Sequence, residues 1–386
     1  MKTGVREAGA TSPPAPVRSA ALRLRRWLFD HALPIWWERG ADRAEGGFHD
    51  SLDQAGRPAA APKRLRVQAR QAHVYALAAR LGWDGPAAEA CRHGLGHLLA
   101  HRGDDALYRP SPARADAPFD GMGLLYDQAF ALLGLAAGLA LPGEADLEPA
   151  ALALQHRLRD FSHPLGGYRE APGLAAPLFA NPNMHLFESF QAWAALSADP
   201  SWRELAALQA HLGVELLMEG GTSPLIERYG PDWSEPEAAR DRVIWPGHLY
   251  EWAWLLLEWG PDVPRYAEAA LGLIDVAEDS GVDEAGVTIF ALAGDLKPLD
   301  RGARLWAQTE RLRACARAAS LGLAPDLWEA AAEAAKALEA FLAVPQPGLW
   351  RDWRDETGAF REEPAPASSL YHIAGAIAEL ERVCAG

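Results

Sequence analysis

Two short segments of the sequence carry the same arrangement of a histidine and a glutamate. His185 precedes Glu188 and His248 precedes Glu251, each in an H-L-aromatic-E pattern that begins within three residues of a proline. Proline is favoured at helix starts, and residues three apart on a helix share a face. Histidine has an ordinary pKa of about 6.5, and a nearby carboxylate orients the ring and favours its charged form. Both pairs are therefore candidates for moving protons near neutral pH.

Polar and aromatic residues recur at matching positions along the rest of the chain. Six apparent helix starts each follow a short strand-like segment by roughly 20 residues. Residues that mark these starts are spaced by 56, 59, 63, 58 and 66 positions. A recurrence near 60 residues indicates stacked units, here an outer helix, a short hairpin or strand, and an inner helix. The markers are Arg70, Tyr126, His185, His248, Trp306 and His372.

Ala- and Leu-rich segments with helical periodicity, such as 87–100, 201–218 and 324–342, predict a largely helical protein. Six units of about 60 residues account for nearly the whole chain, which favours one domain, over residues 19–386, against the two or three suggested by length. The Pro-, Ala- and Ser-rich residues 1–18 are expected to form a flexible tail. A closed ring would gather the markers at one mouth, whereas an open solenoid would spread them along a groove. The spacing alone leaves both arrangements open.

The composition excludes several classes of protein. The 386 residues include 52 acidic and 37 basic side chains, for a net charge of −15, so a nucleic acid or an anionic membrane is not expected as a partner. Half of the chain is apolar, as in globular proteins, but no run reaches the roughly 18 apolar residues of a membrane span. Three widely spaced cysteines form neither a disulfide framework nor a metal knuckle, which favours the cytoplasm.

Other chemistries have less support. The HxxE spacing is not the HExxH of zinc proteases, and no metal site is expected. The sequence contains no GxSxG motif, and its glycine pairs lead into aromatic strands and not into a phosphate-binding helix. Arg70 is either a solvated charge or a fixed donor for hydroxyls and a developing oxyanion. Trp306, accompanied by Gln308 and Glu310, is either a core residue or a platform for a ligand.

Six motifs in order along the chain resemble the N-acylglucosamine 2-epimerase superfamily, which includes that epimerase, cellobiose 2-epimerase, mannose isomerases and a sulfoquinovose isomerase. The resemblance extends from about Leu33 to Leu380. Its motifs are L-P-x-W-x-E-R-G-x-D-R-x-x-G-G-F (33–48), K-R-L-x-x-Q-A-R-Q (63–71), Y-D-Q-A-F (126–130), N-P-N-M-H-L-x-E (181–188), P-G-H-x-x-E-W-A-W-L-L (246–256) and L-Y-H (370–372).

The resemblance implies an all-α fold, an (α/α)6 barrel of about twelve helices with short β-hairpins in the loops at one mouth. It implies that His248 and His372 are the acid/base pair, with His185 nearby for ring opening or sugar binding. The implied chemistry needs no cofactor: a proton leaves C2 of an opened sugar, a cis-enediolate forms, and a proton returns. Return to C1 gives a ketose, and return to the opposite face of C2 gives the epimer. The implied sugar-pocket residues are Arg70, Tyr126, Asn181, Glu188, Glu251, Trp306 and Glu310.

Within the superfamily, Trp252 after Glu251 and the Leu370-Tyr371-His372 ending are more similar to the mannose isomerases than to the epimerases. We therefore expect interconversion of D-mannose and D-fructose by a monomer or homodimer whose partner is a small sugar. Arg66 departs from the tryptophan that relatives commonly carry there, and residues 307–310 also vary. An additional arginine either suits an anionic substituent such as a sulfonate or phosphate, or points outward.

Several alternatives stay open from the sequence. The chain could be a 2-epimerase of N-acylglucosamine, cellobiose or a related sugar, or an isomerase of an anionic sugar such as sulfoquinovose. A glycoside hydrolase would use two carboxylates, such as those of Glu251 and Glu310, across a sugar. A sugar-binding barrel without turnover is the third class.

Overall fold

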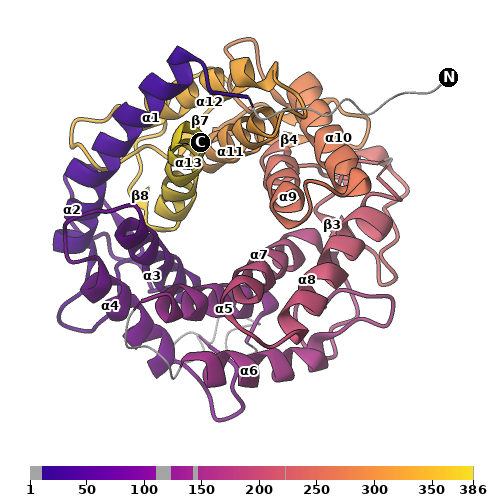
Figure 1. Cartoon of the computed structure of the whole chain (residues 1–386), viewed down its shortest axis with the longest axis horizontal. Helices are drawn as coiled ribbons and strands as arrows, with labels where there is room; N and C mark the ends of the chain where they lie inside the picture. Colours follow the sequence, from indigo (N-terminus) through magenta and orange to yellow (C-terminus); the bar gives the residue numbers. More distant parts are fainter. Residues whose placement is uncertain (1–10, 110–122, 142–146, 222, 386) are drawn as a thin grey trace.

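Two concentric rings of helices form the protein (Figure 1). The computed structural model describes residues 11–109, 123–141, 147–221 and 223–385. The inner ring consists of α3 (Leu65–Arg80), α5 (Leu125–Leu139), α7 (Ala180–Leu196), α9 (Pro246–Trp259), α11 (Leu305–Ser320) and α13 (Ser368–Ala385). The outer ring consists of α1 (Ala15–Trp27), α4 (Ala87–Ala100), α6 (Leu147–Arg157), α8 (Ser201–His211), α10 (Pro264–Gly281) and α12 (Leu327–Leu342). The predicted (α/α)6 barrel is confirmed, and the ring is closed.

The two rings differ in how their helices are buried. In α5 almost every residue is buried, because its neighbours cover it on all sides, whereas α12 buries one stripe, as an amphipathic helix on a surface does. Close approach within the inner ring depends on small residues. A Cβ added to Gly134 of α5 would lie 3.1 Å from Cα of Ala69 in α3. Glycine and alanine at this crossing therefore let neighbouring inner helices come near each other.

Short antiparallel strand pairs lie in the connections that lead to the inner helices. The strands are β1 (Ser51–Leu52), β2 (Leu178–Phe179), β3 (Arg228–Tyr229), β4 (Ala291–Leu292), β5 (Pro298–Asp300), β6 (Ala303–Arg304), β7 (Trp353–Arg354) and β8 (Ala365–Pro366). Their pairing order is β1 with β8, β2 with β3, β4 with β5 and β6 with β7. Most of these pairs join different units of the ring, so they tie the loops of neighbouring units together at one end of the barrel.

A side-chain amide near the start of four inner helices fixes the hairpin that precedes it. Gln68 bonds both the N–H and the C=O of Phe48, and Gln128 does the same to Tyr108, 20 residues earlier. Asn183 and Gln308 clamp Tyr168 and Thr288 in the same way. Each of these amides lies two residues from one of the marker residues. Three of the four clamps span 20 residues and the one made by Asn183 spans 15, which explains the spacing in the sequence. The clamps hold the starts of these four helices, and so four of the six markers, against the hairpins.

The N-terminal helix completes the outer ring. Helix α1 begins at Ala15 after Pro14, and its Arg25 bonds Glu381 of α13 at 2.7 Å. Helical structure thus begins before residue 19, where the tail was expected to end, because proline starts a helix well and α1 packs against α12 and α13. Residues 1–10 of the expected tail lie outside the described residues. Within the described ranges, no helix is long and apolar enough to cross a membrane.

Candidate functional site

The marker residues all lie in the first two turns of the inner helices, at the end of the barrel that carries the strands. Arg70 of α3 donates through Nη2 to the hydroxyl of Tyr126 in α5 at 3.0 Å, and its guanidinium lies 4.1 Å from the ring centre of Phe130. The Tyr126 ring in turn lies 5.3 Å from the ring of His185 in α7. These contacts place one side of the candidate site across three neighbouring units.

Trp306 connects the other side of the site. Its ring centre is 4.9 Å from that of His248 in α9 and 5.7 Å from that of His372 in α13. A Cβ added to Gly247 would lie 2.4 Å from the Trp306 ring, so glycine beside His248 is what lets α11 bring the indole this close. Trp306 is 9% exposed. The indole therefore lies beside both histidines and is not completely covered, as a platform for a sugar would need.

His248 and His372 are each held by a carboxylate of their own. Nδ1 of His248 lies 2.8 Å from Oε1 of Glu227, and Nδ1 of His372 lies 2.8 Å from Oε1 of Glu310. A carboxylate on Nδ1 holds the proton there and leaves Nε2 as the acceptor. Neither Nε2 has a hydrogen-bond partner among the described residues. Both rings thus have a nitrogen ready to exchange a proton with a ligand.

The carboxylate beside His372 is itself paired with a buried arginine. Nη1 of Arg313 donates to Oε2 of Glu310 at 2.8 Å, and the guanidinium stacks on Trp254 at 3.8 Å. Burial opposes the charge on Glu310, but Arg313 and His372 lower its pKa overall. Burial also lowers the pKa of His372 despite its bond to Glu310. His372 is therefore a neutral imidazole beside a carboxylate, which is the state of a general base.

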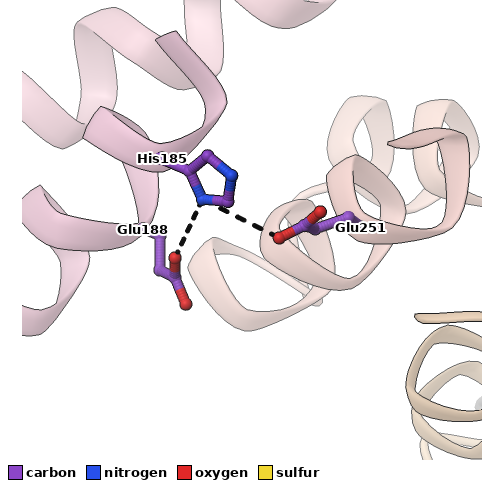
Figure 2. A group of neighbouring side chains, drawn as sticks. All are labelled: His185, Glu188 and Glu251. Atoms are coloured by element: carbon purple, nitrogen blue, oxygen red, sulfur yellow. Dashed lines mark hydrogen bonds and ion pairs between the residues drawn. The ribbon is translucent and has the colours of Figure 1, made fainter. Parts of the chain in front are cut away.

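The third histidine sits among two more carboxylates (Figure 2). Nδ1 of His185 is 3.3 Å from Oε2 of Glu188 and 3.8 Å from Oε1 of Glu251. Burial lowers the pKa of His185 to about 4. Burial raises the pKa of Glu251 well above its ordinary value, and the nearby charges of Glu310 and Glu188 raise it further. His185 is thus neutral at pH 7 and suited to hydrogen bonding with a sugar hydroxyl.

One interpretation of the sequence was wrong. The i, i+3 spacing suggested that Glu251 would pair with His248, as Glu188 pairs with His185. Glu251 instead faces His185 on α7, and the partner of His248 is Glu227, which directly precedes β3. The reason is that the spacing within α9 fixes only the helix face, whereas the packing of the units brings Glu227 to His248 and His185 to Glu251.

Nine of the ten predicted site residues are linked by these contacts. Asn181, in the first turn of α7, has a buried Oδ1 without a hydrogen-bond partner and bonds none of the other nine among the described residues. Three residues that the sequence reasoning did not place are also in the site: Glu227, Arg313 and Tyr371, whose hydroxyl donates to Oε1 of Glu188. The i, i+3 spacing of Glu310 and Arg313 is the signal that could have identified the arginine.

The additional arginine, Arg66, is already paired. Its Nε lies 3.1 Å from Oδ1 of Asp127, which is buried, and its guanidinium is 4.9 Å from the ring centre of Tyr126. Arg66 therefore turns toward the helix α5 beside the site, and part of its charge is neutralised by Asp127.

Comparisons with known proteins agree with this arrangement. The family model described as N-acylglucosamine 2-epimerase (GlcNAc 2-epimerase) matches residues 46–376. A mannose-6-phosphate isomerase of Rhizobium meliloti (strain 1021) is 38% identical over 380 residues, covering 93% of this chain and 96% of the relative. A D-mannose isomerase of Thermobifida fusca is 30% identical over 321 residues, covering 76% and 77%. The crystal structure of a D-mannose isomerase superposes with a TM-score of 0.82 at 20% identity, over 96% of this chain and all of the other.

Proposed function

Because the chain belongs to the N-acylglucosamine 2-epimerase family, we propose that it is a sugar isomerase that interconverts D-mannose and D-fructose by histidine acid/base catalysis without a cofactor. The observation that carries the proposal is the pair His248 and His372. Each ring is held through Nδ1 by a carboxylate, and the two rings flank Trp306. The names of two relatives, a D-mannose isomerase and a mannose-6-phosphate isomerase, support mannose as the sugar.

In the proposed reaction, Nε2 of His372 removes the proton from C2 of the open-chain aldose. The C2–H bond breaks, its electrons form the C1–C2 double bond, and the carbonyl oxygen O1 becomes negatively charged. We assign the stabilisation of this charge to Arg70, whose guanidinium lies beside Tyr126 and Tyr371. A proton then returns to C1 from Nε2 of His248, which acts in its protonated, imidazolium form beside Glu227, and the O2 hydroxyl proton passes to O1 to give the ketose. His372 afterwards releases the C2 proton to solvent and His248 takes one up, which restores both rings. The neutral state of buried His372 suits it to the first step.

A phosphorylated substrate is the second candidate, and the name of the Rhizobium relative favours it. The structure gives a reason to prefer the neutral sugar. Arg66, the arginine that suggested an anionic substituent, lies against Asp127, so a phosphate would have to compete with a carboxylate that is already buried beside it. We therefore place D-mannose ahead of its 6-phosphate.

Hydrolysis of glycosides fits the geometry less well. Both oxygens of Glu310 are already bonded, one to His372 and one to Arg313, so this carboxylate is not free to attack a sugar or to protonate a leaving group. Glu251 alone does not supply the second carboxylate that such chemistry needs.

The test is incubation of the purified protein in heavy water with D-mannose, D-mannose 6-phosphate, D-glucose, N-acetylmannosamine and cellobiose, followed by NMR. We expect D-fructose from D-mannose, with deuterium entering from solvent, and a lower kcat/KM for the 6-phosphate. An epimer as the main product would indicate a 2-epimerase. If no sugar in the panel reacts and none exchanges its C2 proton, the proposal is wrong, and binding without exchange would indicate a sugar-binding barrel.

A further inference from the structure

A histidine and two glutamates in the barrel interior offer three ligand atoms at one point. They are His185 and Glu188 of α7 and Glu251 of α9 (Figure 2). Nδ1 of His185 is 3.3 Å from Oε2 of Glu188 and 3.8 Å from Oε1 of Glu251, and the three ligand atoms lie within 4.8 Å of one another. The HxxE pattern supplies two of these ligands, and the third comes from the neighbouring unit.

The two carboxylates are buried and form no direct ion pair with an arginine or lysine among the described residues, although the charge of Arg313 acts on both of them. The side chains of Glu188 and Glu251 are 12% and 2% exposed, and neither has an arginine or lysine nitrogen within 4 Å among the described residues. Tyr371 donates to Oε1 of Glu188. Oε2 of Glu251 is buried and has no hydrogen-bond partner in the described parts of the chain. A buried carboxylate with an unpartnered oxygen is costly, and a bound cation relieves that cost.

A second group of ligand atoms, from Glu251, Glu310 and His372, lies nearby but is less available. Oε1 of Glu310 accepts a bond from His372, and Oε2 accepts one from Arg313. An ion at that point would have to break the pair that orients His372 and would lie near a fixed guanidinium. The comparison favours the group around His185.

We propose that His185, Glu188 and Glu251 bind a divalent transition-metal ion, with Zn²⁺ the best fit, when the pocket holds no sugar. One imidazole nitrogen and two carboxylates form a zinc donor set, with bond lengths of about 2.0 to 2.2 Å. Donors of a tetrahedral site at those lengths lie about 3.4 Å apart, close to the 3.3 and 3.8 Å seen here. On binding, the Nδ1 lone pair goes to the metal, the ring carries its proton on Nε2, and Glu251 releases the proton of its carboxyl group to solvent. The fourth position is left for water.

The ion would act as an inhibitor and not as a cofactor, because it occupies the carboxylates and the histidine that the proposed sugar contacts need. Binding of the metal stands independently of the proposed function, whereas competition with sugar rests on it. We therefore expect Zn²⁺ to raise the apparent KM for D-mannose and EDTA to restore activity.

Metal binding is measured on the full chain without sugar, by calorimetry with ZnCl₂ and by visible absorption with CoCl₂, which reports tetrahedral coordination. We expect one site per chain, weakened at least about tenfold in Glu251→Gln and in Glu188→Gln, since each removes one charged ligand. His101→Gln is the control. His97 lies on α4 and His101 directly follows this helix; their rings stack at 4.4 Å outside the barrel interior, where two neighbouring imidazoles offer a site for adventitious metal. This variant should bind Zn²⁺ as the wild type does.

The inference is wrong if Zn²⁺ does not bind at millimolar concentration, if both glutamine variants bind it unchanged, or if His101→Gln abolishes binding. Circular dichroism confirms that each variant folds. Should one glutamine variant fail to fold, the folded variant decides, and an unchanged Zn²⁺ affinity in it overturns the inference. If the wild type binds Zn²⁺ and both glutamine variants lose that binding, but the wild type converts no sugar, only the proposed function is refuted.

Discussion

The two oxygens of Glu310 serve different partners, and replacing this residue by glutamine separates their tasks. Oε1 accepts from Nδ1 of His372 and Oε2 accepts from Nη1 of Arg313, both at 2.8 Å. The substituted amide has one acceptor oxygen and one NH₂ group. A guanidinium can only donate, whereas Nδ1 of a neutral imidazole can donate or accept. In Glu310→Gln we therefore expect the amide oxygen to face Arg313 and the NH₂ to face His372.

That orientation reverses the tautomer of His372. With an N–H pointing at Nδ1, the ring carries its proton on Nε2, the nitrogen that accepts the C2 proton in the proposed mechanism. Loss of a positioned general base costs about 10²- to 10⁴-fold in kcat, which is about 3 to 5 kcal/mol of transition-state stabilisation. KM should change little, because neither oxygen of Glu310 is free to contact the sugar. Initial rates of fructose formation across a range of pH measure both constants.

Glu227→Gln is the matched control. Glu227 holds Nδ1 of His248 at 2.8 Å, and no arginine or lysine bonds it among the described residues, so its amide oxygen can stay turned toward the histidine. The tautomer is kept, and exchanging a charged acceptor for a neutral one should cost no more than about tenfold. A Glu310→Gln enzyme within tenfold of the wild type would contradict the tautomer argument. Equal large losses in the two variants would contradict it as well.

Three further predictions concern the surroundings of the pair. Trp306→Ala should raise KM by about tenfold while Trp306→Phe keeps most of the affinity, measured by initial rates; equal KM values in the two variants would exclude a ring platform. Arg313→Met should lower the free energy of unfolding by about 3 to 5 kcal/mol in urea at pH 8, because the charge of Glu310 is left buried without its cation. This loss should shrink at low pH, where Glu310 can take a proton, and a loss independent of pH would refute the cause. Burial lowers the pKa of His73 to about 4, so the unfolded chain binds a proton below pH 6.5 that the folded chain does not. Wild-type stability should therefore fall as the pH drops from 6.5 to 4, and His73→Gln should remove up to about 3 kcal/mol of that fall, as urea midpoints would show.

The fold was predictable because its signal is local and repeated. Helical periodicity, the roughly 20-residue step from hairpin to inner helix and the 60-residue recurrence all arise within one unit. The amide clamps explain the 20-residue step, because the side chains of Gln68, Gln128 and Gln308 each bond the backbone of the residue 20 positions earlier, in the preceding hairpin. The choice between ring and solenoid was not local. It depends on contacts between the first and last inner helices, and only the family resemblance indicated the answer.

The positions of the site residues were predictable from the same register, but their pairing was not. His185 and Glu188 pair within one helix, as the i, i+3 spacing implies. The partner of His248 is a residue of the preceding loop, and the partner of His372 is Glu310, 62 residues earlier on α11. Glu251 reaches His185 from the following unit. Such pairings depend on how neighbouring units pack, and no spacing within one unit encodes them.

Closure of the ring is therefore part of the chemistry as well as of the fold. Nη1 of Arg70, in the first inner helix, donates to the carbonyl of Ser368 at the start of the last one, at 3.4 Å, while Nη2 donates to Tyr126 of the second. The same guanidinium lies 5.2 Å from the ring of Tyr371, which precedes His372. An open solenoid of identical units would leave Arg70 without α13 and would leave His372 on an end helix, away from the arginine that we propose stabilises the enediolate. The proposed base and the proposed oxyanion donor come together only because the sixth unit packs against the first.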